Sequence, residues 1–325
     1  MNFTVILNQM LIFTILISVG IFSIKAKIIN NETKDGIARF VIDVTMPLLI
    51  FFSLTNMKIT PEITKNSLIF ILLSFFSTFF LMISAFFVFK KVVTKSKVDT
   101  SLSLKKIFVI QTVFGNCVFF GFPFFDVLFP GGKGLFYAIL YYIVQASILW
   151  TVGILILDKG EKKDISISKN LFKMVNPNTI AFILGLIFLF FNISFPDVIE
   201  SSLGGLGKTS LYFSMIYIGA TLGQMKFKYN LRNYNISYII SLNKMIITPI
   251  LMLIILLIIR FYFPLDSTVI SIIVLETGMP IMALLVILAK KYEHDVNFAT
   301  ENLFISTIFS LISLPLLYFI LSFFI

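Results

Sequence analysis

Long apolar runs, separated by short polar connections, make up most of the chain. Runs of this length can cross about 30 Å of hydrocarbon as helices. They lie at residues 4–24, 37–57, 67–89, 107–129, 134–157, 177–196, 204–224, 235–259, 267–288 and 297–325. The connections contain Pro, Gly or charged residues, and none is long enough to form a separate domain. The pattern predicts an all-α integral membrane protein with ten transmembrane helices.

The fourth run is interrupted in its middle. Residues 107–129 contain Gly115, Asn116, Gly121 and Pro123. In a helix interior, Gly costs about 1 kcal/mol and Pro about 3 kcal/mol. A broken helix frees backbone groups that lipid cannot satisfy, so such breaks are tolerated where protein buries them or a wet cavity lines them. The interruption therefore predicts a functional site at this break.

The ninth run carries a matching break. Within residues 267–288, Glu276 and Gly278 are followed by Pro280, which lies about half the 325-residue chain after Pro123. Interrupted apolar runs in corresponding positions of two halves are typical of inverted-repeat transporters, which bind substrate at these breaks. The two broken helices are therefore predicted to cross at a common site.

The distribution of basic residues predicts the orientation. The connections after the odd-numbered runs, with the adjoining run ends, hold 20 Lys and Arg, whereas those after the even-numbered runs hold 5. By the positive-inside rule the first set is cytoplasmic, so both termini are predicted outside the plasma (inner) membrane. Five spans per half give opposite orientations, as an inverted duplication requires. The predicted repeats are residues 1–157 and 158–325.

Composition excludes several classes of protein. The chain is 58% hydrophobic and only 13% charged, with a mean hydropathy of +1.00. The net charge of +10 lies in short loops, which argues against a nucleic-acid surface. Cys117 is the one cysteine and His294 the one histidine, so no metal or cofactor site is expected. No Ser/His pair or zinc motif indicates an enzyme. His294, between two acidic residues, is predicted to be solvated.

Two charged residues lie deep within the predicted spans. Lys244 is about 12 Å inside the eighth run and Glu276 about 13.5 Å inside the ninth, which places both near the midplane. Intramembrane charges pair whether or not they bind a ligand, so a structural ion pair and a transport site are both open. Asp43, nearer the cytoplasmic end of the second run, is a third coupling candidate, with a wetted interfacial position as its simpler interpretation.

The motifs at both breaks resemble a known family. The first matches a G-N-x-x-F-x-G-x-P signature at Gly115, Asn116, Phe119, Gly121 and Pro123. The second-half pattern comprises Leu275, Glu276, Met279, Pro280, Ala283, Ala289, Tyr292, Asp295, Ala299, Ser306, Thr307 and Pro315. Lys244 with Pro249, and the stretch from Gly219 to Leu222, extend the match. The chain thus resembles the auxin efflux carrier family, including its bacterial malate-permease-like members.

The resemblance carries expectations about architecture. It implies a scaffold domain, a crossover domain in which the two broken helices meet, alternating access, and a homodimer. The architecture would be similar to that of sodium/proton antiporters or bile-acid symporters. One departure lies at Thr209, Ser210 and Leu211, where the family pattern has a proline.

The first functional hypothesis is a secondary transporter of a small organic anion, a mono- or dicarboxylate that is auxin-like or malate-like. New half-helices are expected to begin after Pro123 and after Pro280, with their positive amino ends facing each other beside Asn116 and Lys244. Glu276, at the carboxyl end of a first half-helix, would favour a proton or sodium. The predicted substrate-binding residues are Gly115, Asn116, Gly121, Pro123, Lys244, Glu276, Gly278 and Pro280.

Several alternatives remain open at this point. Broken helices also build anion channels, although no ring of like charges is visible. A cation-coupled symporter for another substrate class, similar to the bile-acid symporters, would use the same breaks. A membrane sensor that does not transport would also retain them. The simplest alternative is that Gly and Pro merely kink two packed helices.

Overall fold

The computed structural model describes residues 3–58, 60–93, 102–158, 172–193, 195–225 and 231–325, and the regular elements within them are all helical. The first half contains α1 (Phe3–Lys25), α2 (Asn31–Phe40), α3 (Met46–Thr55), α4 (Pro61–Val88), α5 (Leu102–Val113), α6 (Phe122–Leu128), α7 (Lys133–Ile148) and α8 (Ile154–Leu157). The second contains α10 (Pro177–Phe190), α11 (Asp197–Ile199), α12 (Gly205–Lys208), α13 (Ser210–Gln224), α14 (Leu231–Leu242), α15 (Thr248–Tyr262), α16 (Ser267–Thr277), α17 (Leu284–Lys291) and α18 (Val296–Leu321). Short π-helical segments join several of them: η1 (Val41–Thr45), η2 (Phe89–Val93), η4 (Cys117–Gly121), η5 (Leu149–Gly153), η7 (Glu200–Gly204) and η8 (Asn243–Ile247).

Six helical stretches in the described residues are long and apolar enough to cross a membrane. They are Thr4–Lys25, Asn31–Thr55, Ile63–Lys91, Lys133–Leu157, Asn235–Tyr262 and Val296–Leu321. Three shorter apolar helices, Cys117–Leu128, Pro177–Phe190 and Ser267–Thr277, lie in the predicted fourth, sixth and ninth runs. The predicted seventh run is formed by α12 and α13. The described residues thus have an all-helical fold that is consistent with a membrane protein, while ten complete spans remain a prediction.

Capping residues define where many of these helices begin. The Thr60 side chain accepts from the Ile63 N–H, and Asn176 forms a reciprocal capping box with Thr179. Pro61 and Pro177 occupy the first helical turns, where the missing N–H costs nothing. These residues therefore set the starts of α4 and α10 at the polar connections between the apolar runs.

Glycine allows the closest packing between helices. At Gly219 an added Cβ would overlap the Ile17 carbonyl oxygen, and at Gly20 it would overlap the Ile216 carbonyl oxygen. The backbones of α1 and α13 are therefore in direct contact, as in the small-residue interfaces of membrane helices. Gly223, one turn after Gly219, continues this contact against Ile24.

We expect Gly219→Ala to lower the free energy of unfolding by about 1–3 kcal/mol, because the extra methyl group forces α1 and α13 apart. Gly205→Ala is the matched control, since nothing lies within 4 Å of a Cβ at that helical position. That control is expected to be neutral or to stabilise by up to about 1 kcal/mol. Thermal unfolding of the purified variants measures both changes, and equal stability of the two would contradict the close contact.

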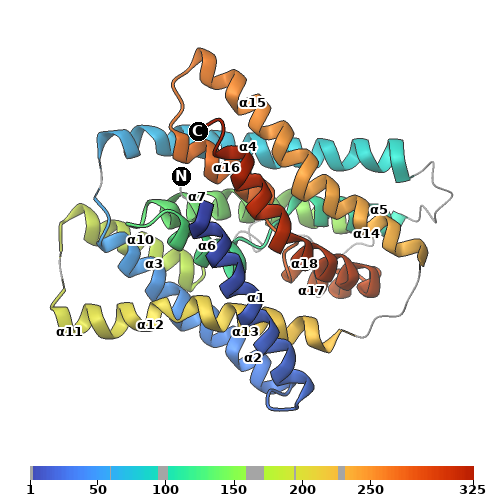
Figure 1. Cartoon of the computed structure of the whole chain (residues 1–325), viewed down its shortest axis with the longest axis horizontal. Coiled ribbons are helices and arrows are strands. Elements are labelled where there is room, and N and C mark those ends of the chain that lie inside the picture. Colours follow the sequence, from blue (N-terminus) through green and yellow to red (C-terminus); the bar gives the residue numbers. More distant parts are fainter. Residues whose placement is uncertain (1–2, 59, 94–101, 159–171, 194, 226–230) are drawn as a thin grey trace.

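The helices form two packing groups, and each group contains helices from both halves of the chain. In one group α1 lies along α13, and α3 lies along α10. In the other, α4 packs on α7 as α14 packs on α18, and α16 contacts α7 as α5 contacts α18. Figure 1 shows α1, α2, α12 and α13 below and α4 and α15 above, with α6, α7 and α18 between them.

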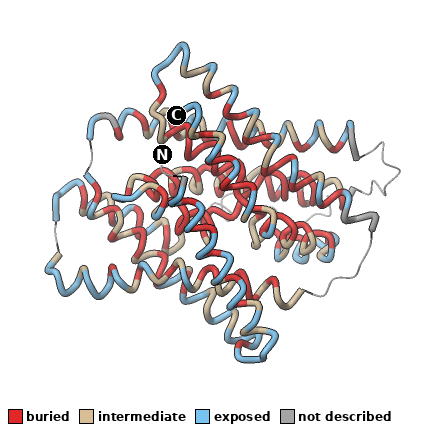
Figure 2. Tube along the Cα trace, in the orientation of Figure 1, coloured by how far each residue is buried: buried red, intermediate tan, exposed pale blue. Residues whose placement is uncertain are grey.

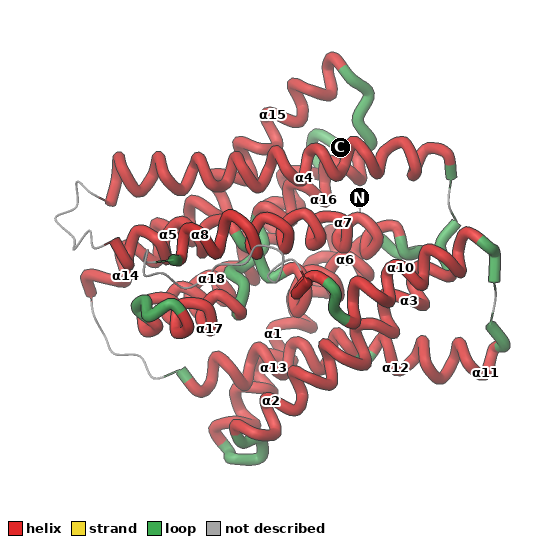
Figure 3. Tube along the Cα trace, turned by 180° about the vertical axis from the view of Figure 1, so that it is seen from behind, coloured by secondary structure: helices red, strands yellow, loops and turns green. Residues whose placement is uncertain are grey.

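The centre of the molecule is the most buried part. Figure 2 shows buried residues concentrated in the middle and exposed residues along the outer helices. Seen from behind, loop segments lie in the interior and are surrounded by helices (Figure 3). In a helical membrane protein, non-helical backbone at this position requires an explanation by packing or function.

Candidate functional site

The first break separates α5 from α6. Regular helix ends at Val113 and resumes at Cys117, so Gly115 and Asn116 lie in non-helical backbone. The Asn116 side-chain oxygen accepts a hydrogen bond from the Phe119 N–H at 3.3 Å and so caps the new helix. The expectation that this half-helix begins after Pro123 is wrong, because Pro123 lies in the first turn of α6, after π-helix η4. Pro123 thus lies within the helical stretch Cys117–Leu128 and supplies no N–H to it, and the π-helical turn η4 directly precedes it.

The second break separates α16 from α17. Helix α16 ends at Thr277, and the chain is extended or irregular until Leu284. The Gly278 N–H still bonds back to the carbonyls of α16, whereas the Ile281 N–H donates to the Ser306 Oγ at 3.2 Å. Ser306, on α18, thus satisfies one backbone group that the break releases.

The two breaks meet directly, as predicted for crossing helices. The Asn116 N–H donates to the Pro280 carbonyl oxygen at 2.7 Å, and the Met282 N–H donates to the Phe114 carbonyl oxygen at 3.2 Å. Gly115 and Ile281 form an isolated antiparallel bridge between these bonds. A Cβ on Gly115 would lie 3.0 Å from the Met279 Cβ, so glycine permits this approach. The backbone groups freed by one break are satisfied by the other.

Lys244 lies in η8 and caps the first half-helix. Its side chain is fully buried, and its Nζ donates to the carbonyl oxygens of Thr112 at 3.0 Å and Val113 at 3.3 Å. These are among the last carbonyls of α5, which have no partner within their own helix and carry its negative partial charge. The position of Lys244 is therefore explained by the end of α5.

Glu276 is fully buried near the first break, in a different setting. Within the described residues, neither of its carboxylate oxygens has a hydrogen-bond partner, and no ion pair with Lys244 lies within 4.0 Å. A Cβ on Gly121 would lie 3.6 Å from the Glu276 Oε1, in ordinary van der Waals contact, so the carboxylate lies directly beside η4. Burying an ionised carboxylate without hydrogen bonds is costly, so Glu276 is an uncompensated polar group at the crossing.

A small cavity adjoins Asn116 between the crossing and α13. Its volume is about 10 Å³, which is room for about one water molecule. Its walls comprise Asn116, Ala283, Leu303 and Thr307 on one side and Tyr217, Ile218, Thr221 and Leu222 of α13 on the other. The Phe119 and Tyr217 rings lie beside it with centroids 4.7 Å apart. The space next to Asn116 is therefore nearly closed in this structure.

A larger cavity of about 770 Å³ lies elsewhere, between α3, residues 130–132 and α11–α12. None of the predicted substrate-binding residues lines it. Its polar lining includes Asp126, which accepts from the Ser53 Oγ at 3.1 Å, together with Glu200 and Lys208. Its size alone does not make it the candidate site, since the convergent backbone and charged groups lie at the crossing.

Two further residues were singled out in the sequence, Asp43 as a coupling candidate and His294 as a solvated residue. Asp43 lies in η1 with an exposed side chain, and it lines neither the small cavity nor the larger one. The structure therefore does not bring this coupling candidate to Lys244 and Glu276. The expectation for His294 is wrong, because only 6% of its surface is exposed. Its ring nitrogens lie 2.7 Å from the Leu157 carbonyl oxygen and 3.0 Å from the Ser103 Oγ.

Gln111, an amide within an apolar run, forms an interhelical hydrogen-bond clasp between α5 and α18, the role that single amides in membrane helices often have. The Gln111 Nε2 donates to the Ala299 carbonyl oxygen at 2.7 Å, and the Asn302 Nδ2 donates to the Gln111 Oε1 at 2.6 Å. The four-residue spacing of Asn302 and Ser306 places both side chains on one face of α18, and this is the signal that indicates the partner of Gln111. This clasp and Ser306 hold α18 against both breaks.

Apolar helices of membrane-spanning length, with two broken helices paired in the interior, define a multi-pass membrane protein of the transporter class. The model of a family described as "Membrane transport protein" matches residues 5–318. The chain belongs to this family, which confirms the resemblance to the auxin efflux carriers. The family consists of transport proteins and not of enzymes.

Two archaeal relatives support this assignment. The chain is 26% identical to an uncharacterized transporter of Methanocaldococcus jannaschii, with 95% of this chain and 97% of that protein aligned. It is 29% identical to an uncharacterized transporter of Methanothermobacter thermautotrophicus over 62% of this chain and 63% of that protein. Both similarities concern transporters and leave the substrate open.

Proposed function

We propose that this protein is a secondary transporter that moves a small organic anion, a mono- or dicarboxylate, by alternating access. The observation that carries the proposal is the direct pairing of the two breaks, at Asn116–Pro280 and Met282–Phe114, beside a cavity. Non-helical backbone in a membrane protein is expected at such a cavity, and repeat-fold carriers bind substrate there. Asn116 is the residue we assign to the substrate, because it lines the cavity and lies at a helix start that favours anions.

Corresponding helices of the two halves make corresponding contacts, which supports an architecture of two inverted five-helix repeats, residues 1–157 and 158–325. The contact of α1 with α13 corresponds to that of α10 with α3 when the halves are interchanged, and the breaks of α5–α6 and α16–α17 correspond to each other. In this proposal α1–α3 and α10–α13 form the scaffold. The crossover domain consists of α4–α8 and α14–α18.

The small cavity supports movement between these two groups. Its walls belong to the crossing on one side and to α13 on the other. A volume of about 10 Å³ cannot hold an organic acid, so substrate entry requires the crossing to separate from α13. The Phe119–Tyr217 contact would open in that step.

Glu276 supports coupling to a cation. A buried carboxylate without hydrogen bonds is relieved when it takes up a proton or a sodium ion. Lys244 already donates to two carbonyls of α5, so we assign it to the support of the crossing. Of Lys244 and Glu276, Glu276 is therefore the stronger coupling candidate.

Thermal unfolding of the purified protein in the presence of mono- and dicarboxylates, each with and without sodium and at two pH values, tests the proposal. A ligand that binds the folded state raises stability by about 2.7 kcal/mol at 100 times its dissociation constant. We expect a carboxylate to stabilise the protein and to be taken up by proteoliposomes with saturation. Stabilising compounds that cross without saturation would indicate a channel instead.

The predicted topology can be tested at two exposed connections. Asn192 follows α10 and Lys291 ends α17, and both side chains are exposed. In a Cys117→Ser background, a cysteine at Asn192 should react with an impermeant reagent in intact cells, and one at Lys291 should react only after permeabilisation. Equal labelling of both in intact cells would contradict the ten-span plasma-membrane topology with both termini outside.

A further inference from the structure

An apolar groove runs along the outer surface of α15, away from the crossing. Its volume is about 630 Å³. It is lined by Ile250, Leu253, Ile254, Leu257, Ile258, Phe261 and Tyr262 of α15 and by Ile320 and Phe324. These positions on α15 recur every three to four residues and so form one helical face. The face extends over about 18 Å, slightly more than half of the hydrocarbon thickness and thus about the depth of one leaflet.

A cation lies beside one end of this groove: Arg260 does not line the groove itself, but its guanidinium contacts Phe324, which does. Arg260 is in the last turn of α15, beside the highly exposed Phe261 and Tyr262. Its guanidinium donates to the Ser267 Oγ at 3.3 Å and to the Phe324 carbonyl oxygen at 3.5 Å. Exposed aromatic residues beside an arginine are typical of the level of the lipid headgroups. The groove therefore begins at this level and continues toward the membrane centre.

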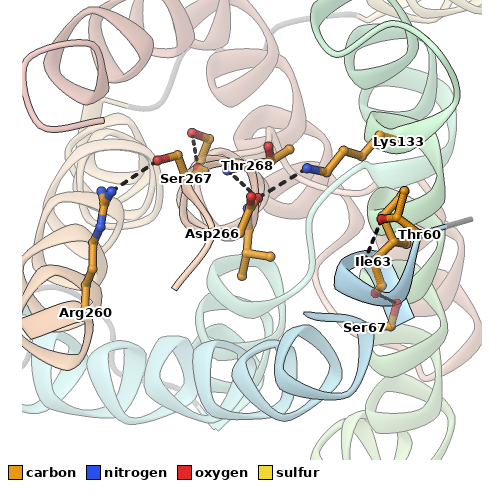
Figure 4. A network of polar contacts seen from close by, with 10 residues as sticks. Thr60, Ile63, Ser67, Lys133, Arg260, Asp266, Ser267 and Thr268 are labelled. Carbon is orange, nitrogen blue, oxygen red and sulfur yellow. Dashed lines mark hydrogen bonds and ion pairs between the residues drawn. The ribbon is translucent and has the colours of Figure 1, made fainter. Parts of the chain in front are cut away.

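The neighbouring carboxylate is already engaged. Asp266 accepts from the Thr268 and Val269 N–H groups at the start of α16 and pairs with Lys133 at 3.5 Å. Figure 4 shows Arg260 on one side of Ser267 and the Asp266–Lys133 pair on the other. Among the described residues, Arg260 has no carboxylate within 4.0 Å. Its positive charge is thus available to an external anion.

We propose that the groove binds one acyl chain of an anionic phospholipid whose phosphate group contacts Arg260. Charge complementarity selects the headgroup, because a guanidinium binds phosphate with two charge-assisted hydrogen bonds. The apolar lining and one-leaflet length accommodate the chain. Such a lipid would contact α15 and, through Phe324 and Ser267, the ends of α18 and α16.

Native mass spectrometry of the purified protein, titrated with phosphatidylglycerol or with phosphatidylcholine of the same chains, tests the proposal. We expect phosphatidylglycerol to bind at least about tenfold more tightly, and Arg260→Gln to remove this preference. Arg260→Lys retains the charge but not the two-pronged geometry, so it should retain part of the preference. Ile254→Trp fills the groove and should weaken the binding of both lipids.

Arg39→Gln is the matched control, since Arg39 is an exposed arginine on α2, and no residue of α2 lines the groove. It should leave the preference unchanged. Equal binding of the two lipids to the unmodified protein, or an unchanged preference in Arg260→Gln, would overturn the proposal. Competition by inorganic phosphate at concentrations like those of the lipid would also overturn it, because it would show a free-anion site.

Discussion

Replacing Lys244 by Met is expected to lower the free energy of unfolding by about 3 kcal/mol, whereas Glu276→Gln is expected to leave stability near the unmodified value and to abolish coupled transport. The asymmetry follows from the contacts. Lys244 donates two hydrogen bonds to carbonyls of α5, and its loss leaves these buried groups unpaired. Glu276 has no hydrogen-bond partner in the described residues, so neutralising it removes a burial cost.

The double variant distinguishes this arrangement from a simple ion pair. If the two residues only neutralised each other, each single change would destabilise and the double change would restore stability. Here Glu276→Gln cannot replace the donor that α5 loses, so the double variant should recover only the electrostatic part. Thermal unfolding and proteoliposome uptake measure both effects, with Lys208→Met, at an exposed lysine, as the control. Full recovery of stability and uptake in the double variant would assign both residues to a structural pair.

Asn116→Ala is expected to lower substrate affinity by about 10- to 100-fold, the loss of one hydrogen bond to a charged ligand. Among the described residues, the Asn116 amide nitrogen donates to no protein group, and it lies beside the small cavity. The substitution also removes a helix cap, which costs about 1 kcal/mol of stability. Measured carboxylate affinity and uptake should therefore fall far more than stability.

Asn30→Ala provides the matched control. Asn30 caps α2 by accepting from the Thr33 N–H at 2.8 Å, so the same cap is lost at a position remote from the crossing. Stability should fall by a similar amount while transport is retained. Asn116→Asp keeps the capping oxygen and replaces the amide donor by a negative charge, so it should fold and fail to transport. Normal uptake by Asn116→Ala and Asn116→Asp would show that Asn116 does not contact substrate.

The pairing of the breaks explains why two sequence signals belong to one feature. Gly115 and Pro280 each read as a local defect of an apolar helix, and their matching positions in the two halves predicted that they meet. The sequence does not predict which groups form hydrogen bonds with the backbone released at the breaks. The Ile281 N–H bonds to Ser306, and Phe114 and Asn116 bond to the opposite break. These partners are far apart in sequence and are selected only by packing.

The hydrogen-bond partners of Lys244 likewise could not be predicted from the sequence. Helix rise placed Lys244 and Glu276 at similar depth, so pairing was one natural prediction. Depth does not specify direction around the helix axis, however, and η8 directs the Lys244 amine to the end of α5. His294 similarly looked solvated because its sequence neighbours are acidic, while the connection it occupies is folded onto the ends of α5 and α8.

The sequence by itself determined the membrane class, the apolar runs, the two breaks and the family, because hydropathy and backbone propensity are local properties. Tertiary structure decided which groups satisfy the broken backbone, that Lys244 caps α5, that Glu276 has no hydrogen-bond partner in the described residues, and that the cavity beside Asn116 is closed by α13. These features depend on which helix faces meet. Lipid accepts any apolar face, so the apolar pattern carries little information about facing, and only the packing of glycines and buried polar groups fixes it.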